Sequence, residues 1–173
     1  LMNTSNFTFT AGVWFHIAMV YDETEVSDAD KLKVYIDGVL QTNTVSGFAL
    51  TSLNVSNSLP TEIGKAGGFT TNEFFGNLDE IAIFTVAKTQ TDITAIYNSG
   101  TPTTITGATA HYKMGENSTF VGGVWTVEDV VGSNDGTSAN MTIEDRIGDA
   151  PNSTSNAVSL NMDEVDRETD VPT

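Results

Sequence analysis

Hydrophobic and polar residues alternate along most of the first 84 residues, which is the pattern of half-buried β-strands. An apolar run predicts a strand over Val13–Tyr21, and an alternating stretch predicts another over Leu32–Asp37. The polar segment 22–30 between them is interpreted as the long loop of a β-hairpin. Asp37-Gly38 predicts a tight turn into a further strand over Val39–Thr42, because glycine accepts a positive φ.

A single short helix is expected after residue 88. Thr89 or Thr91 can cap it by accepting a hydrogen bond from an unpaired backbone N–H. Ser99-Gly100 and the proline that follows end it. The apolar residues at helical spacing are Ile93, Ile96 and Tyr97. Four further strands are expected at 62–64, 74–84, 111–114 and 124–127.

The last thirty residues contain few apolar side chains. Residues 144–173 hold eight acidic side chains against two arginines. Three alternating apolar residues, Val158, Leu160 and Met162, predict one extended strand in a segment that has little core of its own. We therefore divide the chain into a β-sandwich part at 1–104, additional strands at 105–143 and an acidic extended arm at 144–173.

Composition excludes several classes of function. The 173 residues carry 7 lysines and arginines against 23 acidic residues, a net charge of −16. Binding to a phosphate backbone or to anionic lipid needs clustered basic residues, so we expect neither a nucleic-acid partner nor a membrane partner. Cysteine is absent, which excludes disulfides, cysteine-ligated zinc and a thiol nucleophile. Because Leu1 precedes Met2, we expect the chain to be a fragment.

Five motifs in the first hundred residues resemble the laminin-G-like, or concanavalin A-like, jelly-roll family. In order, they are Trp14–Asp22, Leu32–Gly38, Ile63-Gly64, Phe75–Phe84 and Ile96–Gly100. The resemblance covers residues 7–100 and implies an all-β antiparallel sandwich with one short helix. It also implies that several strands should precede the tryptophan strand, whereas only thirteen residues do so here.

A later segment resembles the opening strand and first turn of the same family. It consists of Ala110–Glu116 followed by Gly132–Thr137. The tail that contains it could pair with its own sandwich, start a second unit, or add a strand to a neighbouring subunit. The whole arrangement, with its acidic end, is similar to virion surface proteins of marine bacteriophages.

The acidic loop is the candidate metal site. Hard carboxylate oxygens on a loop suit Ca²⁺, and the set we name is Asp22, Asp28 and Asp30. The resemblance adds support, since some laminin-G-like domains bind calcium. The spacing matches no EF-hand, and a solvated hairpin loop is the simpler interpretation.

Three further sets of residues are candidates for an active site. Asp79-Glu80 is expected in mid-strand, where neighbouring side chains point to opposite faces and cannot converge on one bond. His16 is expected to hydrogen-bond within a sheet rather than touch a ligand. The acidic residues Glu164, Asp166 and Glu168 resemble a jelly-roll glycosidase strand, but lie outside the matched region and are interpreted as a chance match.

The sequence therefore predicts a non-enzymatic protein of a virion surface, either a capsid decoration or a fibre component, which could contact glycans. It is expected to be oligomeric, with neighbouring subunits bound through the arm. The alternative is a carbohydrate-binding or adhesion module of a secreted bacterial protein. Aromatic residues near loops are candidates for sugar contacts or for the core, namely Phe69, Phe74, Phe120 and Trp125.

Overall fold

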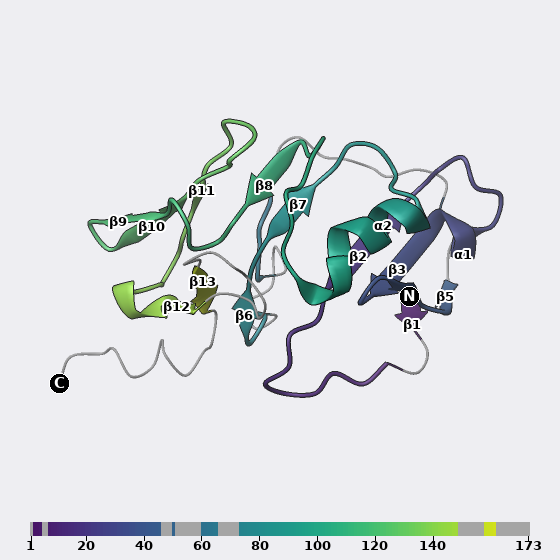
Figure 1. Cartoon of the computed structure of the whole chain (residues 1–173), viewed down its shortest axis with the longest axis horizontal. Coiled ribbons are helices and arrows are strands. Elements are labelled where there is room, and N and C mark those ends of the chain that lie inside the picture. Colours follow the sequence, from purple (N-terminus) through teal and green to yellow (C-terminus); the bar gives the residue numbers. More distant parts are fainter. Residues whose placement is uncertain are drawn as a thin grey trace. The chain divides into compact units, whose positions relative to one another are not determined.

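The computed structural model describes residues 2–4, 7–45, 50, 60–65, 73–148 and 158–161. Within these residues, all pairings between strands are antiparallel, and the longest helix has eight residues (Figure 1). The fold is thus all-β, as the alternating pattern predicts. Among the described residues, no helix has the length and apolar character needed to cross a membrane. The chain forms two compact units, each built from two separate stretches.

Unit 1 comprises residues 1–56 and 84–104. It contains a three-stranded sheet in the order β2–β3–β4 and a two-stranded sheet of β1 and β5. Its elements are β1 (Met2–Thr4), β2 (Ile17–Tyr21), α1 (Asp28–Lys31), β3 (Leu32–Ile36), β4 (Val39–Leu40), β5 (Asn43–Val45), α2 (Gln90–Tyr97) and the 3₁₀ turn η1 (Asn98–Gly100).

The predicted hairpin and its tight turn are confirmed. β2 and β3 pair along their whole length, and β3 pairs with β4 across the turn. Asp37 and Gly38 have φ values of +49° and +76°, which glycine adopts without strain and aspartate tolerates. The apolar run is strand only from Ile17 onward, and the acidic loop contains the one-turn helix α1, which the sequence did not predict.

The predicted helix α2 is confirmed, including its start. Thr89 accepts a hydrogen bond from the Asp92 backbone N–H, and the Asp92 carboxylate accepts one from the Thr89 N–H at 2.9 Å. This reciprocal pairing satisfies two backbone donors that the first helical turn leaves open. The helix buries Ile93 against Val20 and Tyr35, and these three side chains form the core of unit 1.

Unit 2 comprises residues 57–83 and 105–173. Its strands form three small sheets, in the orders β7–β8, β9–β10–β11 and β6–β13–β12. Its elements are β6 (Asn77–Leu78), β7 (Ile81–Ile83), β8 (Ala110–Tyr112), β9 (Thr119–Val121), β10 (Val124–Val127), β11 (Gly136–Thr137), the 3₁₀ turn η2 (Ile143–Asp145), β12 (Arg146–Gly148) and β13 (Val158–Asn161).

The prediction of one continuous strand over Phe74–Phe84 is wrong. Two short strands, β6 and β7, are separated by Asp79-Glu80, where Glu80 has a φ of +50°. A left-handed residue cannot continue a pleated strand, so the chain changes direction there. The strand predicted at Glu62–Gly64 is also absent from the described residues; an isolated bridge between Lys65 and Glu73 stands nearby.

The core of unit 2 surrounds Trp125, which is 1% exposed. The buried side chains packed with it are Ala110, Tyr112, Met114 and Val127. The indole N–H donates to the Thr142 carbonyl at 2.6 Å, so the polar group of this large side chain is satisfied. Trp125 and its neighbour Phe120 are therefore core residues rather than exposed sugar contacts.

Asp129 is the polar centre of unit 2. Its buried carboxylate accepts hydrogen bonds from the backbone N–H groups of His111, Gly132 and Asn134, at 3.0, 3.1 and 3.3 Å. These donors, the His111 N–H foremost, lower the pKa of Asp129. A Cβ on Gly132 would lie 2.4 Å from the Asp129 Oδ2 atom, so the turn needs glycine there. One carboxylate thus joins β8 to the turn before β11.

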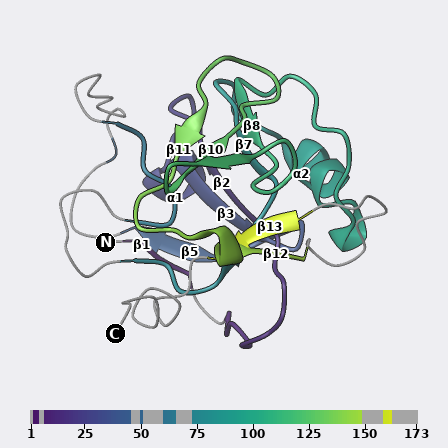
Figure 2. The same cartoon turned by 90° about the vertical axis from the view of Figure 1, so that its left-hand side faces the viewer.

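Part of the predicted arm pairs within its own chain. β13 lies between β12 and β6, with Leu160 opposite Arg146 on one side and Leu78 on the other. Both views show β12 and β13 side by side (Figure 2). β13 thus has both of its strand partners in its own chain. Met162 lies outside the described residues.

The predicted boundary after residue 104 coincides with a boundary between the units. The predicted first domain, 1–104, also includes residues 57–83, which belong to unit 2. The division at 143 stays a prediction.

Candidate functional site

Three carboxylates converge in unit 2. Asp79, Glu80 and Glu116 each place one oxygen within 4.8 Å of the others, and all three are partly buried. This is the group of three or more potential metal ligands found among the described residues. We call these three residues the acidic cluster.

The backbone conformation at Glu80 brings two of the three carboxylates of the acidic cluster together. Because Glu80 is left-handed, Asp79 and Glu80 do not alternate across a strand, and their side chains reach the same place. The Asp79 Oδ1 atom accepts the Glu80 backbone N–H at 2.9 Å, which fixes the first carboxylate. The premise that adjacent carboxylates must diverge here is therefore wrong, since it assumed a regular strand.

The second carboxylate of the acidic cluster is held by a buried histidine. His111 stands opposite Ala82 in the β7–β8 pair, and its Nε2 lies 2.7 Å from the Glu80 Oε2. The histidine side chain is 4% exposed and the glutamate side chain 18%. This hydrogen bond is shielded from water, and it becomes an ion pair when the imidazole is protonated.

Glu116 reaches the acidic cluster from the turn that follows β8. Met114 and Asn117 in this turn have φ values of +53° and +60°, and the chain reverses between them. The Glu116 carboxylate also lies 3.7 Å from the Lys113 ammonium group. Sequence reasoning missed Glu116, because its proximity to Asp79 depends on the pairing of β7 with β8.

The acidic cluster could serve two kinds of chemistry. Carboxylate oxygens are the preferred ligands of hard divalent cations, and Ca²⁺ takes six to eight oxygens, so three side chains would supply part of a shell. Carboxylates also accept hydrogen bonds from hydroxyl groups, which are the main polar groups of sugars. Both uses draw on residues within unit 2.

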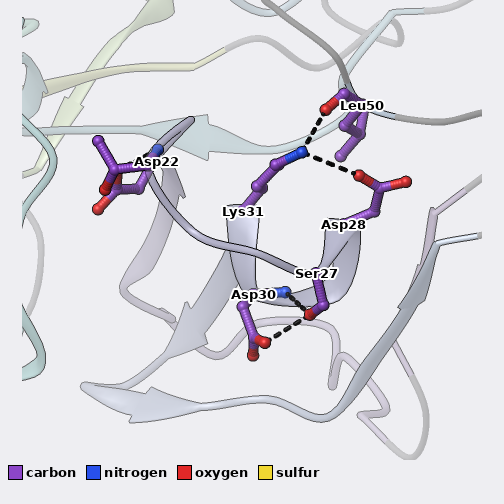
Figure 3. A network of polar contacts seen from close by, with 7 residues as sticks. Asp22, Ser27, Asp28, Asp30, Lys31 and Leu50 are labelled. Carbon is purple, nitrogen blue, oxygen red and sulfur yellow. Dashed lines mark hydrogen bonds and ion pairs between the residues drawn. The ribbon is translucent and has the colours of Figure 1, made fainter.

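The three aspartates predicted as a calcium set are not brought together. Asp28 faces the Lys31 ammonium group at 3.3 Å, and Asp30 pairs with the Ser27 hydroxyl (Figure 3). Figure 3 shows Asp22 well away from both, and its Oδ1 accepts the Thr24 hydroxyl at 2.6 Å. Among the described residues, these aspartates form no group of three converging ligands.

Several charged side chains of this loop have hydrogen-bond or ion-pair partners close by in the sequence. The Thr24 hydroxyl, followed by the Thr24 N–H, lowers the pKa of Asp22. Glu25 lies 2.7 Å from the Lys33 ammonium group, and its hydrogen bond raises the pKa of that lysine. The loop is stabilised by its own side chains and by a helix cap at Ser27, which fits the interpretation as a solvated hairpin loop.

His16 lies outside regular strand, and its backbone N–H donates to the Asp37 carboxylate at 2.9 Å. Its Nδ1 atom is buried and has no hydrogen-bond partner among the described residues, in contrast to the expected bond within a sheet. Burial lowers the pKa of the imidazole, while the nearby Asp37 charge opposes this shift. The ring packs near Tyr97, with centroids 5.7 Å apart.

Two exposed aromatic rings precede the acidic cluster in sequence. Phe74 and Phe75 are 45% and 54% exposed. Phe74 therefore remains a candidate for contact with a sugar, and Phe75 is a second candidate. The other predicted residues, namely Phe69, Glu164, Asp166 and Glu168, lie outside the described residues.

Comparison with known families gives one result that bears on this site. A laminin-G-type family model, described as the concanavalin A-like lectin/glucanases superfamily, matches residues 2–94. This match spans more than half of the chain, and the chain belongs to this family. Domains of the family are typically non-catalytic binding modules, although some members are glycosidases. No curated protein and no solved structure matches the chain.

Family membership supports a module of the carbohydrate-binding type in general.

Proposed function

We propose that the chain is a non-catalytic glycan-binding module displayed on a virion surface. The observation that carries the binding part is membership of the concanavalin A-like lectin/glucanases superfamily. The three converging carboxylates of the acidic cluster in unit 2 support this proposal, because carboxylates accept hydrogen bonds from sugar hydroxyls. The alternative location is a secreted bacterial adhesion protein, with the same binding chemistry.

A sugar needs hydrogen-bond acceptors and an apolar surface. Glu116 and Asp79 supply partly buried carboxylates, which form stronger hydrogen bonds than neutral acceptors. Phe74 and Phe75 supply exposed rings on which the C–H face of a sugar can pack. In this proposal the carboxylates orient the glycan and the rings add contact area.

The acidic cluster is proposed to bind rather than hydrolyse. A retaining glycosidase needs a nucleophile and an acid/base residue about 5 Å apart on either side of the bond that breaks. Here the Glu80 carboxylate is fixed by His111, and Asp79 accepts the neighbouring backbone N–H. We propose that Glu80 serves to hold the β6–β7 connection beside β8, whereas Glu116 and Asp79 contact the sugar through hydrogen bonds.

The binding proposal is tested with the wild-type chain on a glycan array, followed by calorimetric titration of the strongest hit. Glu116→Gln removes one acceptor charge from the acidic cluster and is expected to weaken binding about tenfold, the equivalent of one charged hydrogen bond. Asp28→Asn is the matched control, because Asp28 contributes to the loop of unit 1. Its affinity should equal that of wild type.

Three results of this experiment would count against the proposal. One is the absence of binding to any glycan on the array, and another is equal loss in the two variants. The third is release of reducing sugar from the hit, which would replace binding by hydrolysis. Repeating the titration with calcium and then with a chelator shows whether a cation takes part.

The virion location rests on the resemblance and on the strong negative charge, which keeps an abundant surface protein soluble. Because β13 already has a strand partner of its own chain on each side, neighbouring subunits are proposed to contact the arm at 144–173 without adding a strand to β13. Immunogold labelling of particles from the source tests this location. Label on intact particles is the expected result, and label confined to secreted material would favour the adhesion module.

A further inference from the structure

Two side chains of α2 hold the helix against the turn between β3 and β4. At the start of the helix, the Gln90 side-chain amide donates to the Gly38 carbonyl at 2.6 Å. At its end, the Tyr97 ring lies so close to the same glycine that a Cβ there would be 2.9 Å from the Tyr97 Cδ1 atom. Between these two contacts, Ile93 packs into the core of unit 1. The docking of α2 therefore depends on the Asp37-Gly38 turn.

His16 is bonded to this turn and packed against the end of the helix. Its N–H donates to the Asp37 Oδ1 atom, and its carbonyl accepts the Asp37 N–H, both at 2.9 Å. Its ring lies beside the Tyr97 ring, with 5.7 Å between the centroids. Because two hydrogen bonds hold the backbone of the histidine in place, a change in its ring acts on the side chains packed against it, and these include Tyr97 of α2.

The buried Nδ1 atom of His16 makes this contact sensitive to protons. The atom has no hydrogen-bond partner among the described residues. In the neutral imidazole it is only an unused acceptor when the proton is on Nε2. In the protonated imidazole it becomes a charged donor, and a buried charged donor without an acceptor is costly. Protonation therefore favours an arrangement in which water reaches the ring.

The groups around the imidazole leave this cost only partly compensated. The Asp37 carboxylate of the turn favours the charged ring, but burial has the larger effect, and the pKa of His16 is lowered from 6.5. From α2 the ring of Tyr97 faces the imidazole, and the charged residue of this helix, Asp92, lies in its first turn. Lys33 of β3 has an acidic partner of its own, and β2 and β4 contain no charged residue.

We propose that His16 makes the docking of α2 responsive to pH, so that mild acid releases the helix from the hairpin. Above pH 6.5, the ordinary midpoint of histidine, the imidazole is neutral whether or not α2 is docked, and docking has its full stability. Below that value the undocked state takes up a proton that the docked state resists, until the pH passes the lowered pKa of the docked state. Carboxylates change their charge mainly below about pH 5, so they do not produce the same response.

Hydrogen exchange of the whole wild-type chain at pH 7.5 and pH 5.0 tests the proposal. Protection factors correct for the intrinsic exchange rate at each pH and report local opening. An isolated helix of eight residues is marginal in water, so the amides of residues 93–97 should lose protection at least about threefold at pH 5.0. The amides of Ala18 and Val20, in the hairpin of β2 and β3, should keep theirs. Unchanged protection of α2, or an equal loss in helix and hairpin, overturns the proposal.

His16→Phe keeps an aromatic ring beside Tyr97 and removes the nitrogen that takes up the proton. The protection of α2 should then be the same at both pH values. A pH response that persists in this variant assigns the response to another group and overturns the proposal. The wild-type measurement stands by itself if the variant does not fold.

Asp37→Asn provides a test in which no contact is removed. Asparagine tolerates the positive φ of this position and still accepts the His16 N–H, but it lacks the charge that opposes burial. The midpoint of His16, measured by NMR titration of its ring, should therefore fall further, and the release of α2 should move to lower pH.

Asp28→Asn is the matched control, because it removes a charge from the loop of unit 1 and should leave this midpoint unchanged. A midpoint that stays or rises in Asp37→Asn, or a wild-type midpoint at or above 6.5, contradicts the proposal. Because glycan binding is assigned to unit 2, failure here leaves the proposed function standing.

Discussion

The two units of this chain are stabilised in different ways. Unit 1 joins a β-hairpin to a capped helix, and its core consists of Val20, Tyr35 and Ile93. Unit 2 packs its core around Trp125 and also buries polar side chains. His111, Asp129 and Asp145 are the buried polar or charged side chains among the described residues, and all three belong to unit 2.

This difference shows how two parts of one all-β chain can respond to different conditions. An apolar core depends on the area removed from water, which pH does not change directly. A buried carboxylate that accepts several backbone N–H groups depends on its ionisation. Unit 2 should therefore respond to strong acid through Asp129, whereas unit 1 should respond mainly to loss of apolar packing and, in mild acid, through His16.

The largest expected effect is that of Trp125→Ala. Removing a fully buried indole should cost about 3–5 kcal/mol of the free energy of unfolding and leaves the Thr142 carbonyl without its donor. The matched change in unit 1 is Ile93→Ala, expected to cost about 2–5 kcal/mol. Denaturant unfolding followed by circular dichroism measures both. A loss under about 1 kcal/mol for Trp125→Ala would show that the indole is not the centre of the core.

The next effect concerns acid and Asp129. Since backbone donors lower the pKa of Asp129 in the folded state, its contribution to stability is present above the ordinary value of 3.8. That contribution is lost as the pH falls through the lowered folded pKa. Asp129→Asn should therefore destabilise the protein at pH 7, and the gap from wild type should close as the solution is acidified.

Melting temperatures of wild type and variant from pH 7 to pH 2 check this prediction. Asp28→Asn is the control, because Asp28 pairs with one lysine at the surface of unit 1. It should change the melting temperature little at any pH. A constant gap between Asp129→Asn and wild type across the range would show that the charge itself is not what stabilises the turn.

The smallest effect is expected at the start of α2. Thr89→Ala removes the cap acceptor and should cost about 1 kcal/mol of the free energy of unfolding. Thr91 is the second residue of the helix and does not form the cap. Thr91→Ala should therefore be neutral or slightly stabilising, because alanine is the better helix former. Urea titration gives the free energy of unfolding of both variants. A loss in Thr89→Ala alone is due to the missing cap, because both variants lose a threonine. Equal costs would contradict the assignment of the cap.

Unit 1 could largely be predicted from the sequence because its signals are local. The alternation in β3, the Asp37-Gly38 turn and the Thr89 cap are each encoded within a few neighbouring residues. The one-turn helix α1 was missed, since Ser27 and Asp30 sit in a segment whose acidity suggested only loop.

The acidic cluster could not be predicted, because it depends on backbone geometry and distant pairing. A left-handed Glu80 in an apolar stretch is not visible in a pattern of hydrophobic residues. Glu116 is 36 positions beyond Glu80 along the chain and meets it only because β7 pairs with β8. The preceding Gly76-Asn77 pair, which weakens a strand, was the available hint that the stretch is interrupted.

The sequence stretches of the two units alternate along the chain, and this limits where the protein can be cut into separate fragments. Residues 84–104 complete unit 1, but residues 57–83 already belong to unit 2. A cut at any single point therefore separates some stretch from the unit that it completes. During synthesis, α2 leaves the ribosome about fifty residues after β4, and Gln90 then donates to the Gly38 carbonyl at 2.6 Å. Until α2 has been synthesised, the hairpin side chains Val20 and Tyr35 lack the contact with Ile93 that buries them in the complete fold.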